Sequence, residues 1–238
     1  MSPSGHDINS GGRGRKDPGE GHRPPADALV VADRLREEYG APTVRHMPPL
    51  DELVLTILSQ NTNDVNRDRA WMELRERFPT WEVVLAADVG DIEEAISVGG
   101  LARAKASYIN GALERIRDER GTLSLDFLSE MSPDEAREYL ISMDGVGPKT
   151  AAIVLQFSLD VPAFPVDTHV HRVSKRLGLI GEKVSREKAH VILAGIFPEE
   201  RYLEIHVNII RHGRQVCDAR KPSCPVCILN DICPSRTE

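Results

Sequence analysis

The amino-acid sequence predicts an all-α fold, and three observations support that fold class. Apolar residues recur at helical spacing through most of the chain from Ala26 onward, whereas few stretches alternate with the period of two that marks a strand. Aromatic residues make up only 5% of the 238 residues, while Leu, Ile, Val and Ala are plentiful. No apolar run approaches the roughly 18 residues of a membrane span, so we expect no insertion into a membrane.

The first half of the chain contains six segments with helical spacing. The first places Leu29, Val30 and Leu35 on one side and ends at Gly40, a residue type common just after a helix. The second begins after two prolines and is apolar nearly all round, which indicates a buried central helix. The six segments cover residues 27–40, 48–60, 64–78, 80–88, 91–100 and 103–121.

Five further helical segments follow in the second half. Ser132 and Pro133 open the first of them as N-cap and first helical residue, with acids in the first turn. The next segment again begins at a proline, Pro148, after a two-glycine turn. The five segments cover residues 132–143, 148–160, 167–179, 185–197 and 200–213.

The N-terminal residues 1–26 have a different composition from the rest of the chain. They are rich in Gly, Pro and Ser and have no apolar core, so we expect a disordered polar tail and not a secretory signal. The net charge of −7 argues against a nonspecific nucleic-acid coat, although screening over about 10 Å leaves room for a local basic surface. We expect a monomeric, cytoplasmic protein.

A tight turn between two helices lies in the sequence MDGVGPKTAA, residues 143–152. Gly145 and Gly147 are expected to take positive φ angles and to let the backbone approach another group closely. The first turn of the following helix, which includes Thr150, has unpaired N–H groups and a partial positive charge. The hairpin Gly145-Val146-Gly147 could therefore bind an anion such as a nucleic-acid phosphate. A close helix–helix turn without a ligand is the alternative.

Lys149 follows this turn at a helix position that electrostatics disfavours, because it adds positive charge to the positive end of the helix. It either contacts a phosphate or acts as a nucleophile, since a positive field favours the neutral amine. Asp167 lies eighteen residues later, at the expected N-cap of another helix. Asp167 either only caps that helix or, if the chain folds back, accepts the amine proton and stabilises a cationic sugar.

All four cysteines lie near the C-terminus with the spacing C-x6-C-x2-C-x5-C, which indicates a metal site. They are Cys217, Cys224, Cys227 and Cys233. Zinc sites usually contain two C-x-x-C pairs, and only one is present, so the spacing favours a [4Fe–4S] cluster over zinc without excluding zinc. Arg220 and Lys221 lie between the first two cysteines. They form either a rigid phosphate-binding loop or an ordinary solvated basic loop.

The chain resembles the endonuclease III family of helix-hairpin-helix DNA glycosylases. The resemblance rests on GVGPKTA, VDTH, HGR and the four-cysteine spacing, in that order, and extends from about residue 27 to 234. It implies a two-lobed all-α fold with double-stranded DNA across the cleft between the lobes. One lobe would be a six-helix barrel, residues 42–161. The other, residues 27–41 and 162–238, would hold a [4Fe–4S] cluster on the four cysteines.

The same resemblance implies roles for individual residues. Lys149 and Asp167 match the catalytic lysine and aspartate, and the lysine indicates a bifunctional glycosylase/AP lyase for oxidised or ring-saturated pyrimidines. Because a damaged base must leave the DNA base stack before it can react, protein side chains other than Lys149 and Asp167 must fill the gap that it leaves. Leu101 resembles the intercalating leucine, with a buried loop leucine as the alternative. Gln60 and Asn61 stand where the family commonly has Ala-Gln, and the sequence leaves open which of the two enters the gap.

The expected reaction belongs to base excision repair. The lysine attacks C1′, expels the damaged base and forms a Schiff base, after which β-elimination nicks the strand. Two alternatives remain at this point. One is a glycosylase for thymine or uracil opposite guanine on the same scaffold. The other is a non-catalytic DNA-binding protein whose hairpin and cysteine loop serve only as phosphate clamps.

Overall fold

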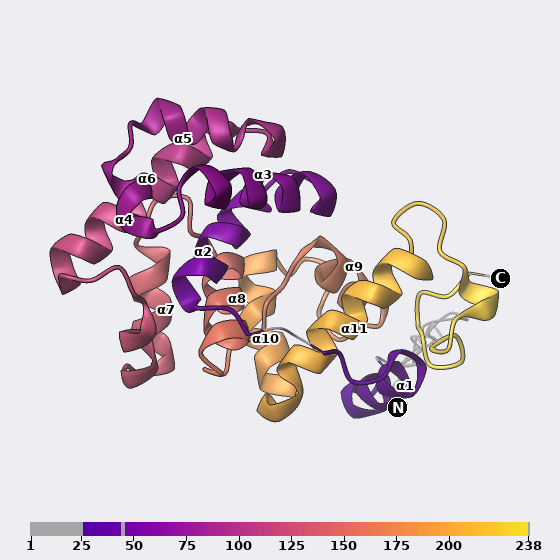
Figure 1. The fold of residues 1–238 in the computed structure, drawn as a ribbon. Helices are drawn as coiled ribbons and strands as arrows, with labels where there is room; N and C mark the ends of the chain where they lie inside the picture. The colour runs from indigo at the N-terminus through magenta and orange to yellow at the C-terminus, as the bar shows by residue number, and fades with distance from the viewer. Residues whose placement is uncertain (1–25, 44–45, 238) are drawn as a thin grey trace, which may run out of the picture.

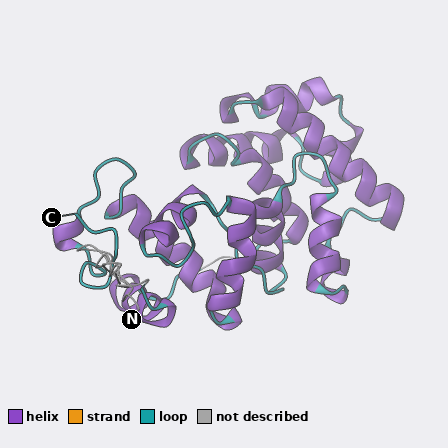
Figure 2. Ribbon diagram, turned by 180° about the vertical axis from the view of Figure 1, so that it is seen from behind, coloured by secondary structure: helices purple, strands orange, loops and turns teal. Residues whose placement is uncertain are grey.

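The structure, a computed structural model, describes residues 26–43 and 46–237. Every regular element in this part of the chain is a helix, as Figure 2 shows. The predicted all-α fold class is therefore confirmed. Among the described helices, none combines the length and the apolar character that crossing a bilayer requires.

The buried apolar side chains form two clusters, and each cluster defines a lobe. The first cluster contains residues between 50 and 155, and we call this part the barrel lobe. Its helices lie in the upper and left parts of Figure 1, where α2 packs along α8. They are α2 (Pro49–Leu58), α3 (Asp64–Arg77), α4 (Trp81–Ala86), α5 (Val89–Ala95), η1 (Ser97–Gly99), α6 (Ala102–Arg120), η2 (Asp126–Glu130), α7 (Pro133–Ile141) and α8 (Pro148–Ser158).

The second cluster combines residues 26–35 with residues between 164 and 229, and we call this part the cysteine lobe. The N-terminal helix therefore packs with the C-terminal helices, as Figure 1 shows for α1 beside α11. The helices are α1 (Ala28–Tyr39), α9 (Thr168–Arg176), α10 (Arg186–Ile196), η3 (Glu199–Arg201), α11 (Tyr202–Gln215) and η4 (Cys224–Val226).

The tail prediction is wrong at its last residue. Ala26 is buried in the second cluster, and its backbone N–H donates to the Leu177 carbonyl at 2.9 Å. This hydrogen bond ties the start of the described chain to α9. Residues 1–25 of the predicted tail lie outside the described residues.

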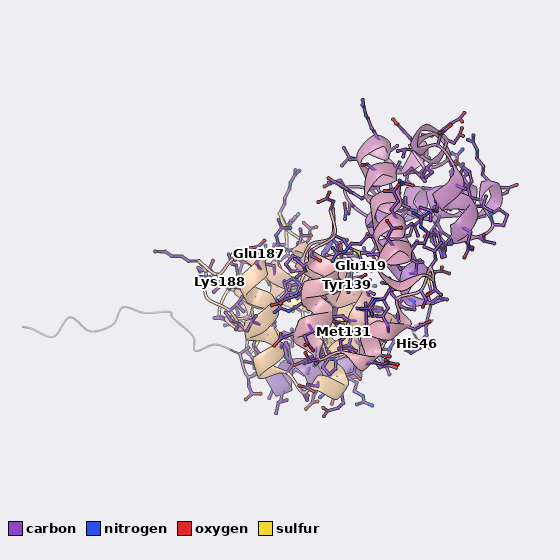
Figure 3. All side chains as sticks on the ribbon, turned by 90° about the vertical axis from the view of Figure 1, so that its left-hand side faces the viewer. His46, Glu119, Met131, Tyr139, Glu187 and Lys188 are labelled. Atoms are coloured by element: carbon purple, nitrogen blue, oxygen red, sulfur yellow. The ribbon has the colours of Figure 1, made fainter. Side chains whose placement is uncertain are left out.

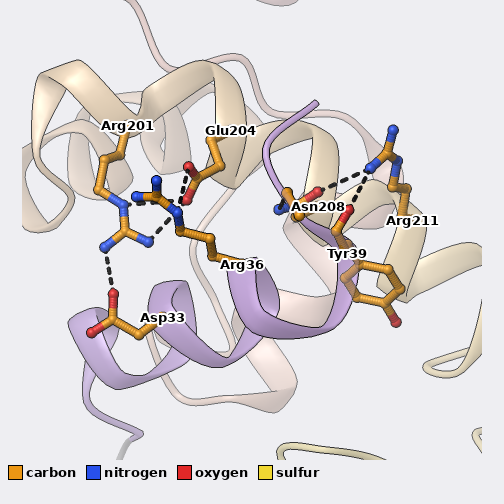
Figure 4. A network of polar contacts seen from close by, with 8 residues as sticks. Asp33, Arg36, Tyr39, Arg201, Glu204, Asn208 and Arg211 are labelled. Atoms are coloured by element: carbon orange, nitrogen blue, oxygen red, sulfur yellow. Dashed lines mark hydrogen bonds and ion pairs between the residues drawn. The ribbon is translucent and has the colours of Figure 1, made fainter. Parts of the chain in front are cut away.

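Polar contacts along one side of α1 hold it against α11 (Figure 4). Arg201 donates to Asp33 at 2.6 Å and to Glu204 at 2.9 Å. The contacts continue through Arg36, Tyr39, Gly40, Asn208 and Arg211. These contacts fix which side of α1 faces α11, and they therefore determine which apolar residues of α1 are buried.

The predicted inner face of α1 is wrong at two positions. Leu29 and Val30 are exposed, and the buried residues are Val31, Ala32 and Leu35. The face is rotated because α1 packs on α11, which lies about 170 residues away in the chain. Local periodicity alone does not contain that contact.

Helix α7 begins where the sequence predicts. The Ser132 hydroxyl accepts from the Glu135 N–H, and the Glu135 carboxylate accepts from the Ser132 N–H at 3.0 Å, which forms a capping box. Further along, Tyr139 of α7 contacts Arg115 of α6, whose guanidinium lies 4.9 Å from the ring centre. Glu119 of α6 lies beside the same ring (Figure 3).

A non-helical segment, residues 160–167, brings the chain back along α8. Helix α8 has 11 residues and is about 16 Å long, a distance that eight residues can span. Nδ1 of His206 donates to the Pro165 carbonyl and Nδ1 of His190 to the Phe164 carbonyl, each at 2.9 Å. These bonds fix the return segment, so that α9 begins near the start of α8.

The two histidines that hold this segment are largely withdrawn from water. Burial lowers the pKa of His190, and it lowers the pKa of His206 to about 4. For His206, nearby Asp167 acts in the opposite direction and Lys149 in the same direction. His206 is therefore neutral in the folded protein at pH 7.

Acidification is expected to destabilise the cysteine lobe. Because the His206 pKa falls from 6.5 to about 4 on folding, its unfolded form gains a proton first as pH drops from 7 to 5. A shift of this size removes about 2 kcal/mol of stability by pH 5. Urea unfolding midpoints should fall over this range, and they should fall less for His206→Gln, which retains a donor without titrating. Equal acid sensitivity of both proteins would contradict this explanation.

Candidate active site

A cleft of about 750 Å³ lies between the two lobes. Helices α2, α3 and α8 line it from the barrel lobe, and α9, α10 and α11 line it from the cysteine lobe. Its size is within the range of pockets that hold small organic ligands, so it can accommodate one extruded nucleotide. Lys149 and Asp167 both line this cleft, one from each side.

Lys149 is the second residue of α8 and is exposed to solvent in the cleft. Pro148 occupies the first helical position, as predicted, and Gly147 is the N-cap. The amine therefore lies at the positive end of a helix, next to backbone N–H groups that have no partner within the helix. A phosphate or a sugar that enters the cleft meets both groups together.

Asp167 is the N-cap of α9, and its Oδ1 accepts from the Val170 N–H at 2.8 Å. The capping role is thus present. It uses one carboxylate oxygen, so the second oxygen can serve another partner. Asp167, Lys149 and His206 all line this cleft, and the charges of the first two act on the pKa of His206 in opposite directions. The fold therefore places at one cleft the two residues that the sequence separates by eighteen positions.

The hairpin differs from expectation at one glycine. Gly145 has φ +75°, and a Cβ there would lie 2.2 Å from the Tyr108 ring, so both conformation and space require glycine. Gly147 has φ −95°, so the predicted positive φ is wrong, because this residue is an extended N-cap. A Cβ at Gly147 would meet nothing within 4 Å. Val146 and Thr150 are buried, and the Val146 N–H donates to the Met143 carbonyl at 3.1 Å, so neither side chain is exposed to a ligand.

Gln60 and Asn61 have different surroundings in the structure. Gln60 Nε2 donates to the Gly145 carbonyl at 2.8 Å, which ties the end of α2 to the hairpin. Asn61 is exposed and has φ +51°, an uncommon conformation outside glycine. This arrangement favours Asn61 as the residue available to enter a gap in DNA.

Leu101 is the N-cap of α6 and also has a left-handed backbone, with φ +51°. Its side chain is 58% exposed, so the alternative of a buried loop leucine is wrong. An apolar side chain held outward on a strained backbone is consistent with a wedge that inserts between bases.

The four cysteines line one small cavity in the C-terminal loop and form no disulfide. Arg176 Nη1 donates to Cys217 Sγ at 3.2 Å, and Nε2 of His212 lies 3.5 Å from Cys227 Sγ. Burial, followed by the charges of the other cysteines, raises the pKa of the Cys227 thiol. A bound cation would offset this repulsion. In the described part of the chain, no three His, Cys, Asp or Glu side chains converge on a single-ion site.

Arg220 and Lys221 lie in the loop between the first two cysteines, and both are exposed. Asp218 Oδ1 accepts from their backbone N–H groups at 2.9 and 3.2 Å. Asp218 therefore shapes the turn, and the two cationic side chains extend from it toward solvent.

Sequence reasoning missed several charged and polar groups that line the cleft. Glu52 of α2 is one of them; burial raises its pKa, and Oε1 accepts from the Thr56 hydroxyl at 3.2 Å. The acidic pair Asp51-Glu52 in the mainly apolar stretch PLDELVLTIL was the available signal. Others include Asp64, Arg67, Arg186, Glu187, His190 and His206. Figure 3 labels Glu187, in the first turn of α10.

An ion pair joins the lobes across this cleft. Arg214 Nη1 of α11 lies 3.1 Å from Asp64 Oδ2 of α3. Both side chains are more than half exposed, so the pair contributes little to stability. Its position nevertheless makes Arg214 a cation that an entering phosphate could engage.

Comparison with known proteins places the chain in a family. A family model described as HhH-GPD superfamily base excision DNA repair protein matches residues 54–199. The endonuclease III of Sulfolobus acidocaldarius is 36% identical over 183 residues, which cover 76% of this chain and 79% of that protein. A protein of Arabidopsis thaliana assigned as a DNA glycosylase is 41% identical over 172 residues, or 72% of this chain; the match spans 59% of that longer protein.

Solved structures agree with the sequence matches. A non-covalent endonuclease III–DNA complex and a trapped endonuclease III–DNA covalent intermediate superpose with TM-scores of 0.75 and 0.76, each at 30% identity. The superpositions cover 87% of this chain and 94% of each solved chain. The chain therefore belongs to the HhH-GPD superfamily of base excision DNA repair proteins, as a relative of endonuclease III.

Proposed function

We propose that this protein is a DNA glycosylase/AP lyase that acts as a monomer on oxidised or ring-saturated pyrimidines in duplex DNA. The observation that carries the proposal is the presence of Lys149 and Asp167 on opposite sides of one cleft, at the N-termini of α8 and α9. Family membership supports the reaction type, and the exposed Leu101 and Asn61 support insertion into a base stack.

The chemistry follows from the positions of the two residues. Lys149 Nζ, as the neutral amine, attacks C1′ of the extruded nucleotide, and the bond between C1′ and the base breaks, so the base leaves with that electron pair. The Asp167 carboxylate accepts the amine proton and stabilises the positive charge that develops on the sugar. Opening of the sugar ring gives a protonated Schiff base. Loss of a C2′ proton then expels the 3′ phosphate and nicks the strand.

Binding of DNA would use the hairpin and the cations around the cleft. The open space at Gly147 lets a phosphate approach the N-terminal N–H groups of α8. Arg220 and Lys221 extend the cationic surface to the cysteine loop. Local cations of this kind are compatible with a net charge of −7, because DNA contacts only one face.

The cofactor we propose is a [4Fe–4S] cluster on Cys217, Cys224, Cys227 and Cys233. Four thiols around one cavity, with the spacing C-x6-C-x2-C-x5-C and only one C-x-x-C pair, fit a polyatomic cluster better than zinc. When bound, the cluster supplies structural cross-linking of the loop and no bond-breaking chemistry. Arg176 and His212 contact its proposed ligands and would hold the sulfur atoms in place.

Replacement of Lys149 tests the covalent step. Lys149→Ala removes the only proposed amine nucleophile, so borohydride trapping of a protein–DNA adduct should be lost. Lys188→Ala is the matched control, because Lys188 is also an exposed lysine in the first turn of a helix and does not line the cleft. Persistent trapping by Lys149→Ala would show that another amine does the chemistry. Trapping by neither wild-type protein nor control on any lesion would favour a DNA-binding role alone.

Asp167→Asn separates capping from chemistry. Asparagine is as good an N-cap as aspartate, so the melting temperature should change little, whereas single-turnover base excision should fall about 100-fold or more. Asp27→Asn, at the N-cap of α1, provides a control with the same change and no expected effect on excision. The assay uses defined duplexes with thymine glycol, 5-hydroxycytosine, or thymine or uracil opposite guanine. Normal excision by Asp167→Asn would reduce Asp167 to a helix cap, and exclusive excision of mismatched thymine or uracil would replace the proposed substrate class.

Metal analysis tests the cofactor. Protein purified without oxygen should be brown and contain about four iron atoms per chain. Cys224→Ala should lose the colour and most of the iron. A colourless protein that contains about one zinc ion would contradict the cluster proposal.

A further inference from the structure

Lys105 is a buried lysine that the proposed reaction does not use. It lies in α6, and its side chain is 1% exposed. Its Nζ donates to the carbonyl oxygens of Leu58 and Gly99, each at 2.8 Å. Lysine is rarely buried because desolvation penalises its charge, so a buried lysine with two defined acceptors requires an explanation.

Both acceptors lie at the ends of helical elements. Leu58 is the last residue of α2, and Gly99 is the last residue of η1. Carbonyl groups at helix C-termini lack partners within the helix and carry partial negative charge, which lysine side chains can satisfy. Lys105 therefore caps two elements at once. Either protonation state of its amine retains the two N–H donors that these bonds need.

The two capped elements lead into the two candidate DNA-inserting residues. Asn61 follows the end of α2 by three positions, and Leu101 follows the end of η1 by two. Among the described non-glycine residues, positive φ occurs at Asn61, Leu101 and Asp160. Asn61 and Leu101 therefore have an unfavourable backbone conformation within three residues of the carbonyls that Lys105 binds.

Two further contacts tighten this arrangement. The backbone N–H of Lys105 donates to the Leu101 carbonyl at 3.0 Å, so the same residue also binds the inserting residue itself. A Cβ at Gly99 would lie 3.3 Å from Ala70 Cβ and 3.8 Å from Lys105 Nζ. Glycine at this position therefore lets α3, the end of η1 and the lysine amine meet closely.

We propose that Lys105 is a positioning residue that fixes the loops of Asn61 and Leu101 at a set separation, so that both side chains enter the base stack together. The proposal rests on the proposed function. A gap left by an extruded nucleotide has a fixed width, and two side chains fill it only if their loops are held relative to each other. Lys105 links the loops directly through Leu58 and Gly99.

The test compares duplex with single-stranded substrates. Lys105→Met retains the apolar stem and removes both donors. Single-turnover excision of thymine glycol from a duplex should fall at least tenfold, and the fluorescence rise of 2-aminopurine opposite the lesion should shrink. Borohydride trapping on a single-stranded abasic oligonucleotide, which has no stack to fill, should stay within about twofold of wild type. Equal losses on both substrates, or no loss on either, would overturn the proposal.

Two controls separate positioning from stability. Leu113→Ala removes a buried side chain from the same helix away from both loops, and below its melting temperature it should leave the duplex-to-single-strand ratio unchanged. In an Asn61→Ala, Leu101→Ala background, Lys105→Met should cause little further loss, because its effect passes through those side chains. If Lys105→Met does not fold, Lys105→Gln, which retains an amide donor, replaces it. Failure of both variants to fold would assign Lys105 to the core alone and reject the proposal. Inactivity of wild-type protein on the duplex, with intact DNA binding, would instead reject the proposed function.

Discussion

The return of the chain along α8 is the constraint on which the rest of the site depends. Residues 160–167 run back to the helix start, and the buried His206 ring and the half-buried His190 ring donate to the carbonyl groups of Pro165 and Phe164. Because of this return, the first turn of α8 and the N-cap of α9 border the same cleft from different lobes. A lysine and an aspartate that are distant in sequence thereby become a possible nucleophile and its partner base. These hydrogen bonds lie within the cysteine lobe and fix the segment that follows α8, the last helix of the barrel lobe.

The surface that would meet DNA combines rigid and strained backbone. Gly145 packs against Tyr108 and is tied to α2 by Gln60, so the hairpin is fixed relative to the loop that holds Asn61. Lys105 fixes that loop relative to the loop of Leu101. The N-terminus of α8 and the residues proposed to fill the gap and to supply the amine thus share one connected scaffold. Such a scaffold reduces the ordering that binding must impose on the protein.

The sequence predicts local features of this structure well and tertiary features poorly. Helix boundaries follow from periodicity, prolines and caps such as Ser132, all of which act within a few residues. The prediction of the inner face of α1 was wrong because the partner of this helix, α11, is remote in sequence. The prediction of a positive φ at Gly147 was wrong because this glycine is an N-cap residue with an ordinary extended backbone. No sequence pattern predicted that Lys105 and His206 are buried, since burial of a lysine or histidine depends on the complete packing around it. From the spacing, the pairing of Lys149 with Asp167 followed only on the condition that the chain folds back, whereas the family resemblance implied it directly.

The most direct measurement is a crystal structure of the borohydride-reduced complex between this protein and duplex DNA that contains an abasic site. The account predicts a covalent bond from Lys149 Nζ to C1′, with the Asp167 carboxylate beside that sugar and both residues in the cleft between the lobes. A bond from any other lysine, or an Asp167 carboxylate that faces away from the sugar, would contradict the account.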